Sequence, residues 1–166
     1  MSIVVENGTG LPTSNAYASV AEADAYFVDR GNTTWEDAEA DAKAQALVRA
    51  TAALDGIYGG RWPGLRLTQA QALDWPRGGA MDRDGYHLTA VPAAVKAATF
   101  EAALIELGSS GSLSPSLDRG GSVIREKVGP IETEYAAGAS AFAVHAAVNH
   151  ALARVINAGS LKMVRA

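Results

Sequence analysis

The chain contains no cysteine and has few charged side chains for its length. Without cysteine it can form no disulfide framework, no thiolate nucleophile and no zinc cluster of the usual kind. Charged residues make up 19% of the 166 residues, which is less than the roughly one quarter found in typical domains. We therefore expect part of the surface to be buried against partner proteins.

Two further absences concern basic charge and long apolar runs. The formal net charge is −4, whereas a general nucleic-acid-binding protein carries a basic excess, so only a local basic patch is compatible with that role. Residues 1–10 contain neither a basic nor an apolar segment, and we expect no signal peptide. No stretch approaches the roughly 20 apolar residues that span a bilayer, so we expect a soluble protein with no membrane partner.

What the chain does contain is alanine, together with an apolar fraction of 48%. Alanine is the strongest helix former, so the composition favours a helix-rich fold. A chain of this length fits one domain with a sizeable core. We expect a single domain over residues 1–166.

Local signals predict where the helices begin and end. Ser19 and Glu22 have the spacing of a capping box, so a helix is expected from there to residue 30. Pro92 suits the first position of another helix, and glycines follow the ends of several apolar periodic stretches. The further expected helices run from residue 33 or 34 to residue 58, over a short stretch at 68–73, and over 92–107 and 142–157.

Two regions have the pattern of β-structure. The β-branched residues 2–6 predict a short N-terminal strand, and residues 122–128 and 131–135 flank a Gly-Pro turn, as in a hairpin. The expected fold class is mainly α: a bundle of about four helices with an inserted β-hairpin and a short N-terminal strand. The C-terminal tail, residues 160–166, follows a glycine stop and is expected to be extended.

No motif predicts catalysis, and we expect no enzyme, no cofactor and no metal site. The histidines, His87, His145 and His150, lack metal-ligand spacing, and the serines lack a nucleophile elbow. Asp82-Arg83-Asp84-Gly85 resembles a fragment of a calcium loop, but its closing glutamate is missing. A plain Asp-Gly turn is the better interpretation of that segment.

A segment that combines arginine and tryptophan has two interpretations. Arg61, Trp62, Arg66 and Arg77, with Trp75 beside them, could grip single-stranded nucleic acid by stacking and ion pairing. Alternatively, the tryptophans pack under a loop while the arginines pair with acids or with partners. The acidic balance of the chain favours the second interpretation.

The order of several motifs resembles one family. The motifs are VVENGTG (4–10), NAYASVAEADAYF (15–27), QALDWPR (71–77), VPAAVKA (91–97) and REKVGPI (125–131). They resemble phage and prophage proteins labelled DnaT-like single-stranded-DNA-binding proteins, which look like head–tail connector, or adaptor, proteins of long-tailed phages. The resemblance covers roughly residues 3–135 and is carried by these motifs in combination.

The resemblance implies a structural protein of the virion. It implies a ring of about twelve copies, made in the host cytoplasm and located at the head–tail junction, between the portal protein and a tail-side completion protein. DNA would pass through its lumen without tight binding. The alternative is a DnaT-like single-stranded-DNA-binding accessory protein of phage replication. Only the first protein would be present in purified virions.

Two segments are candidate contacts of such a connector. The hairpin is expected to join neighbouring subunits by strand addition, with Arg125, Lys127, Glu132 and Glu134 as its contact residues.

The C-terminal tail combines apolar and basic residues and is a hypothetical portal contact. Its alternative is to fold back on the last helix. The tail residues concerned are Leu161, Lys162, Met163, Val164 and Arg165.

Overall fold

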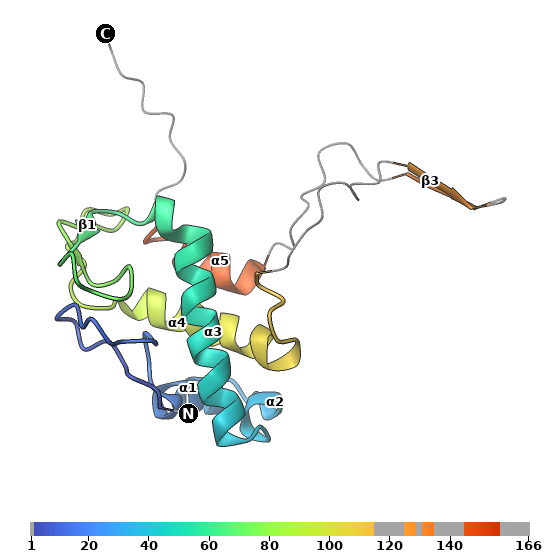
Figure 1. Cartoon of the computed structure of the whole chain (residues 1–166), viewed down its shortest axis with the longest axis horizontal. Helices are drawn as coiled ribbons and strands as arrows, with labels where there is room; N and C mark the ends of the chain where they lie inside the picture. Colours follow the sequence, from blue (N-terminus) through green and yellow to red (C-terminus); the bar gives the residue numbers. More distant parts are fainter. Residues whose placement is uncertain (1, 115–124, 129–130, 135–144, 157–166) are drawn as a thin grey trace, which may run out of the picture.

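The structure is a computed structural model, and it describes residues 2–114, 125–128, 131–134 and 145–156 (Figure 1). Within these residues the protein is mainly helical, as the sequence predicts. The helices are α1 (Val20–Val28), α2 (Thr33–Glu36), α3 (Ala40–Tyr58), α4 (Ala93–Gly108) and α5 (Ala146–Leu152), with a 3-10 turn, η1 (Gly59–Arg61). The strands are β1 (Leu65–Arg66), β2 (Arg77–Gly78), β3 (Arg125–Val128) and β4 (Ile131–Glu134).

Helix α3 crosses α4 at the centre of the molecule, and α5 packs beside α4 (Figure 1). The two central helices bury many small side chains, among them Ala46 and Ala50 of α3 and Ala98 and Ala102 of α4, all 0% exposed. Small residues let two helix backbones approach closely while still excluding water. The alanine richness of the sequence therefore serves packing as well as helix propensity.

The predicted capping box at the start of α1 is confirmed. The Ser19 hydroxyl accepts from the Glu22 amide at 3.2 Å, and the Glu22 carboxylate accepts from the Ser19 amide at 2.8 Å. The same carboxylate forms an ion pair with Lys96 of α4 at 2.6 Å. One local signal thus both starts α1 and fastens it to the core.

The single helix predicted over 34–58 is wrong, because the structure divides it into α2 and α3. The Asn32 side chain accepts from the Trp35 amide at 3.0 Å and caps the short helix α2. Trp35 is 1% exposed and lies 4.8 Å from the Phe27 ring. Burial of this large indole against α1 holds the chain in a turn that a continuous helix could not make.

The short helix predicted at 68–73 is also wrong. Thr68 and Gln71 exchange the two hydrogen bonds of a capping box, at 2.8 and 3.1 Å. The Gln71 amide group, however, donates to the carbonyls of Leu73 and Pro76, at 2.7 and 3.1 Å, and so holds an irregular turn. The Trp75–Pro76 peptide bond in this turn is cis.

The predicted N-terminal strand is reduced to one parallel bridge between Val5 and Ala16. The loop that follows is organised by the buried carboxylate of Glu6, which accepts from the amides of residues 8, 10 and 11 and from the Ser14 hydroxyl at 2.9–3.0 Å. Burial by itself would raise the pKa of Glu6. These hydrogen bonds outweigh burial and lower that pKa.

The predicted hairpin is confirmed: β3 and β4 pair antiparallel across residues 129–130. Its register places Arg125 opposite Glu134 and Lys127 opposite Glu132. Its helical neighbour α5 buries Val148 and Leu152 against the core.

Helix α5 is shorter than the predicted helix over 142–157. It begins at Ala146, and Leu152 is followed by turns as far as Ile156. Residues 142–144, residue 157 and the predicted extended tail lie outside the described residues. None of the helices that the structure describes is long and apolar enough to cross a membrane.

Candidate functional site

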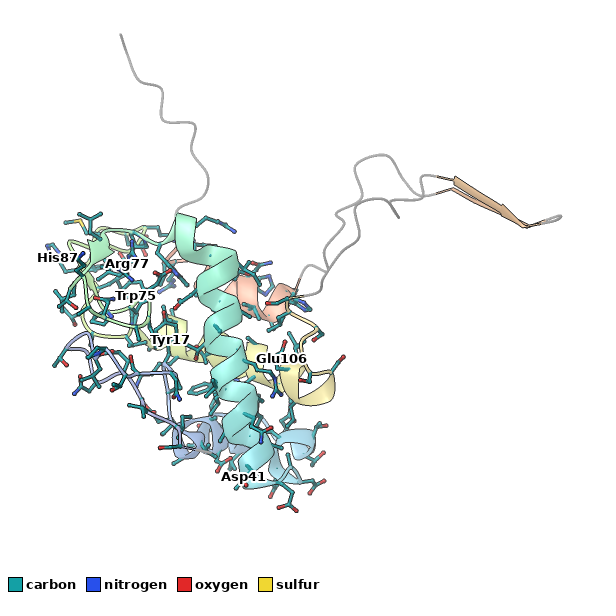
Figure 2. All side chains as sticks on the ribbon, in the orientation of Figure 1. Tyr17, Asp41, Trp75, Arg77, His87 and Glu106 are labelled. Atoms are coloured by element: carbon teal, nitrogen blue, oxygen red, sulfur yellow. The ribbon has the colours of Figure 1, made fainter. Side chains whose placement is uncertain are left out.

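The irregular chain between α3 and α4 exposes an unusual set of side chains. We call these residues the loop face: Arg61, Leu65, Arg66, Leu67, Arg83, Tyr86 and His87. Tyr86 is 73% exposed and Leu65 is 77% exposed. Figure 2 shows His87 and Arg77 at one end of the helical body and Asp41 at the other.

Arg77 holds the backbone of this region together. Its guanidinium donates to the carbonyls of Pro63 at 2.7 Å, Gly64 at 2.8 Å and Asp74 at 3.2 Å. Arg66 faces Arg77 in the short β1–β2 pairing. Arg77 is therefore engaged in joining two parts of the loop, although the sequence suggested it as a nucleic-acid contact.

The two tryptophans of the region are buried. Trp75 is 0% exposed and Trp62 is 4% exposed, and their rings pack edge to face with centroids 5.9 Å apart. The interpretation that the tryptophans pack under a loop is confirmed by this burial. Trp62 packs beside Tyr58 at 5.9 Å, so its indole face is not open to a nucleic-acid base.

Arg61 and Arg66 remain on the surface. The Arg61 guanidinium lies 5.5 Å from the centre of the Tyr58 ring, and Arg66 donates to the Gln69 carbonyl at 3.3 Å. Both residues are exposed, and a guanidinium carries five N–H donors. Of the four residues predicted to contact nucleic acid, these two are placed where a phosphate could reach them.

The sequence did not identify Arg83 and Tyr86 as surface candidates, because the segment around them is typical of a turn. The Asp82 carboxylate accepts from the amides of Asp84 at 3.0 Å and Tyr86 at 2.9 Å, which confirms the Asp-Gly turn. The Tyr86 side chain at the end of this turn is exposed to solvent. Among the described residues, no group of three or more His, Asp or Glu side chains could hold a metal ion.

Arg154, which is distant in the sequence, lies beside the loop face in the folded protein. Its carbonyl accepts from the Arg83 amide at 2.9 Å, which brings the turn after α5 alongside the 82–86 turn. Arg154 is exposed, as is His150 on α5. No local sequence signal could have found this neighbour, because it is 71 positions from Arg83 in the sequence.

A buried polar network fastens the loop face to α3. The Tyr17 hydroxyl donates to the Asp55 carboxylate and accepts from the Trp75 amide at 3.2 Å, while the Asp74 amide donates to Asp55 at 3.1 Å. Burial raises the pKa of Asp55 to about 6. Burial and the adjacent Asp55 charge also raise the pKa of Tyr17.

Glu106 performs a similar fastening at the other end of α4 (Figure 2). Its carboxylate accepts from Arg49 Nε at 3.0 Å and from the amides of Gly111 and Leu113 at 2.6 and 3.0 Å. Burial would raise its pKa, but these donors lower it. Among the described residues, the donors to Glu106 come from α3 and from the turn after α4, so this carboxylate holds that turn against α3.

Charge is distributed unevenly between the two ends of the body. Residues 20–60 carry eight acids and three bases, whereas residues 61–91 carry four arginines, one histidine and three aspartates. The acids Glu36, Asp37, Glu39 and Asp41 are exposed around the α2–α3 junction. An anionic ligand would therefore be attracted to the loop face and repelled from the α2–α3 junction.

The other predicted contact residues belong to the C-terminal tail and to the β3–β4 hairpin. Residues 161–165, the hypothetical portal contact, lie outside the described residues. For Arg125, Lys127, Glu132 and Glu134 the structure describes the strand pairing only. Both sets remain predictions.

Comparison with known proteins gives one result. No curated protein and no solved structure matches the sequence. One family model, described as "Putative DnaT-like ssDNA binding protein", matches residues 1–166. The chain therefore belongs to this DnaT-like family over its whole length.

Proposed function

We propose that the protein binds single-stranded DNA at the loop face, without catalysing a reaction. The observation that carries the proposal is that Arg61, Arg66, Arg83 and Tyr86 are all exposed on the chain between α3 and α4, whose residues Arg77 and His87 lie at the opposite end of the helical body from Asp41 (Figure 2). The description of the family supports the same function. This was the alternative interpretation of the sequence. Arg61 and Arg66 are kept as contacts, and Arg83 and Tyr86 take the place of Trp62 and Arg77.

The chemistry of these side chains suits a single strand. Guanidinium groups pair with phosphates, and an exposed tyrosine ring offers a surface on which a base can stack. With about three arginine–phosphate contacts, the logarithm of the association constant should fall with the logarithm of salt concentration at a slope of about −2. Binding of this size is weak to moderate at physiological salt, in keeping with an acidic protein.

Fluorescence anisotropy of a labelled oligonucleotide tests this proposal. Replacing Arg61, Arg66 and Arg83 together by alanine should weaken binding at least tenfold at low salt and flatten the salt slope. The matched control is Arg30→Ala, because Arg30 is exposed on the acidic side of the body and packs on Tyr26 at 3.4 Å. Equal losses in the triple variant and the control, or no binding by the unaltered protein, would overturn it.

The connector function is a second candidate, favoured by one observation. Among the described residues, β3 and β4 pair only with each other, and an isolated two-stranded hairpin is only marginally stable in water. Strand addition between neighbouring subunits would stabilise it and build a ring. In that proposal the ring lies between portal and tail-completion proteins in the virion, and residues 161–165 contact the portal.

Two measurements separate the candidates. A mass-spectrometric inventory of purified virions should contain the protein if it is a connector. Deletion of residues 122–135 should then abolish ring assembly and incorporation into particles. A protein that is missing from virions, and whose single-strand binding survives that deletion, is not a connector subunit.

A further inference from the structure

Beside the loop face lies a cavity of about 380 Å³. This size falls in the range of about 300–1,000 Å³ that is usual for small-molecule sites. The cavity lies between the N-terminal loop and the chain from β2 to α4, near Arg77 and His87 (Figure 2). Its main lining residues are Gly8, Leu67, Pro76, Gly79, His87 and Ala90.

The wall of this cavity is held in a strained conformation. Ala90 has a φ of +52°, a left-handed conformation that residues with a Cβ rarely adopt. Gly8, with a φ of +95°, approaches it so closely that a Cβ at Gly8 would lie 2.8 Å from the Ala90 Cβ. Strain of this kind gathers at ligand sites, where the surrounding structure imposes it.

The N-terminal side of the cavity is also held in place. The Glu6 carboxylate accepts from the Gly8 amide at 2.9 Å and fixes the loop that carries this wall. On the opposite side, the Leu88 amide donates to the Ala80 carbonyl at 2.9 Å. Both sides are therefore organised before any ligand arrives, which lowers the entropic cost of binding.

The chemistry of the lining matches a flat heteroaromatic ring. Leu67 and Pro76 provide apolar surface, and the exposed His87 imidazole provides a ring on which a base can stack. Glycines leave backbone groups accessible to the polar edges of a base. Arg66 of β1 pairs through its backbone with Arg77, which lines the cavity. A phosphate attached to the inserted base could therefore stay outside the cavity, close to an arginine.

We propose that this cavity holds one unstacked base of the bound single strand. The inference rests on the proposed function and adds to it a defined subsite. Stacking of one base on protein contributes about tenfold or more in affinity. The loop face would therefore bind a strand in two ways, by phosphate pairing outside the cavity and by insertion of one base within it.

A cavity-filling variant tests the subsite without disturbing the arginines. Gly78 also lines the cavity, and a Cβ at this position would meet only the Leu67 Cδ1, at 3.9 Å, which is ordinary contact. Gly78→Val should therefore fold, occupy the cavity and weaken oligonucleotide binding about tenfold, with the salt slope unchanged. The matched control is Gly108→Val, at the far end of α4, where a Cβ meets nothing within 4 Å.

A second pair of variants tests the stacking ring. His87→Ala should weaken binding of the same oligonucleotide, whereas His150→Ala, which removes another exposed histidine, should not. Thermal melting of all four variants shows whether each one folds. In the unaltered protein, an oligonucleotide scanned with single abasic sites should lose about tenfold in affinity at one position only.

The outcomes separate the two proposals. Loss of binding in the arginine triple variant, with no effect of Gly78→Val, His87→Ala or any abasic site, would overturn the base subsite and leave the proposed function standing. If the protein binds no oligonucleotide, NMR titration with free adenosine and thymidine tests the cavity by itself. A shift of the His87 signals would support the subsite, and an unchanged spectrum would overturn it.

Discussion

The acidic end, residues 20–41, and the chain between α3 and α4, residues 61–90, satisfy their backbone hydrogen bonds in different ways. In the acidic end, helices and the caps at Ser19 and Asn32 satisfy them. Between α3 and α4, individual side chains do so, chiefly those of Gln71 and Arg77. A region organised by a few side chains is more sensitive to single substitutions, because each loss leaves several backbone groups without a partner.

The largest difference between the two regions is expected at their apolar residues. Trp75→Ala should lower the free energy of unfolding by about 3–5 kcal/mol, because it empties a fully buried site. Val28→Ala in the acidic end should change it by less than about 0.5 kcal/mol, since Val28 is 67% exposed. Urea titration of both variants measures the contrast. Similar small effects would show that the chain between α3 and α4 is not part of the cooperative core.

The network under the loop face should also give stability a particular pH dependence. Asp55 has a pKa of about 6 in the folded protein, above its usual 3.8. The stability that this shift contributes is complete below pH 3.8 and is lost as pH rises through about 6, a change of about 3 kcal/mol. Glu6 and Glu106 have lowered pKa values, so their contribution is present above 4.5 and is lost as pH falls.

Asp55→Asn tests this assignment through the slope of stability against pH. Between about pH 4 and pH 6, the free energy of unfolding of the unaltered protein should fall relative to that of the variant as pH rises. Only the unaltered protein has the Asp55 carboxyl, whose pKa is raised by burial. The test uses the slope and not the absolute stability of the variant, because an amide NH₂ group at position 55 could face the Asp74 amide donor and destabilise the fold at every pH. Parallel curves for the two proteins would show that Asp55 does not titrate in this range.

The smallest expected contrast concerns two arginines. Arg77→Ala removes the donors to three carbonyls and should cost about 2 kcal/mol. Arg77→Lys should fail to restore the loss, because an ammonium cannot reproduce the planar set of donors. Arg30 is exposed in the acidic end, so Arg30→Ala should change the free energy of unfolding by no more than about 0.5 kcal/mol. Rescue by lysine would indicate that charge, rather than hydrogen-bond geometry, holds the loop.

Sequence reasoning succeeded where short-range signals decide the structure. The Ser19–Glu22 capping box, the helix after Pro92 and the hairpin at 125–134 each depend on residues within a few positions of one another. It failed at 68–73, where Thr68 and Gln71 have the spacing of a helix start. There the long-range requirement to bury Trp75 took precedence over the local signal.

The candidate site was predictable only in part, for the same reason. The arginines of segment 61–77 are visible in the sequence, but burial of Trp62 and the use of Arg77 as a backbone clamp depend on residues far along the chain. Arg154 became a neighbour of Arg83 because α5 packs on α4. Contacts between residues so far apart in the sequence produce no periodic sequence pattern from which they could be predicted.

By itself, the sequence determined the helical class, the cap of α1, the turn at 82–85, the pairing of residues 125–128 with 131–134, and the absence of cysteine chemistry, because propensity, turn geometry and composition act locally. Only the tertiary structure decided which arginines stay exposed, how Asp55 comes to lie beneath the loop, and where a cavity opens beside His87. Those properties arise from packing between distant segments, whose free energy depends on shape and burial that no local window contains.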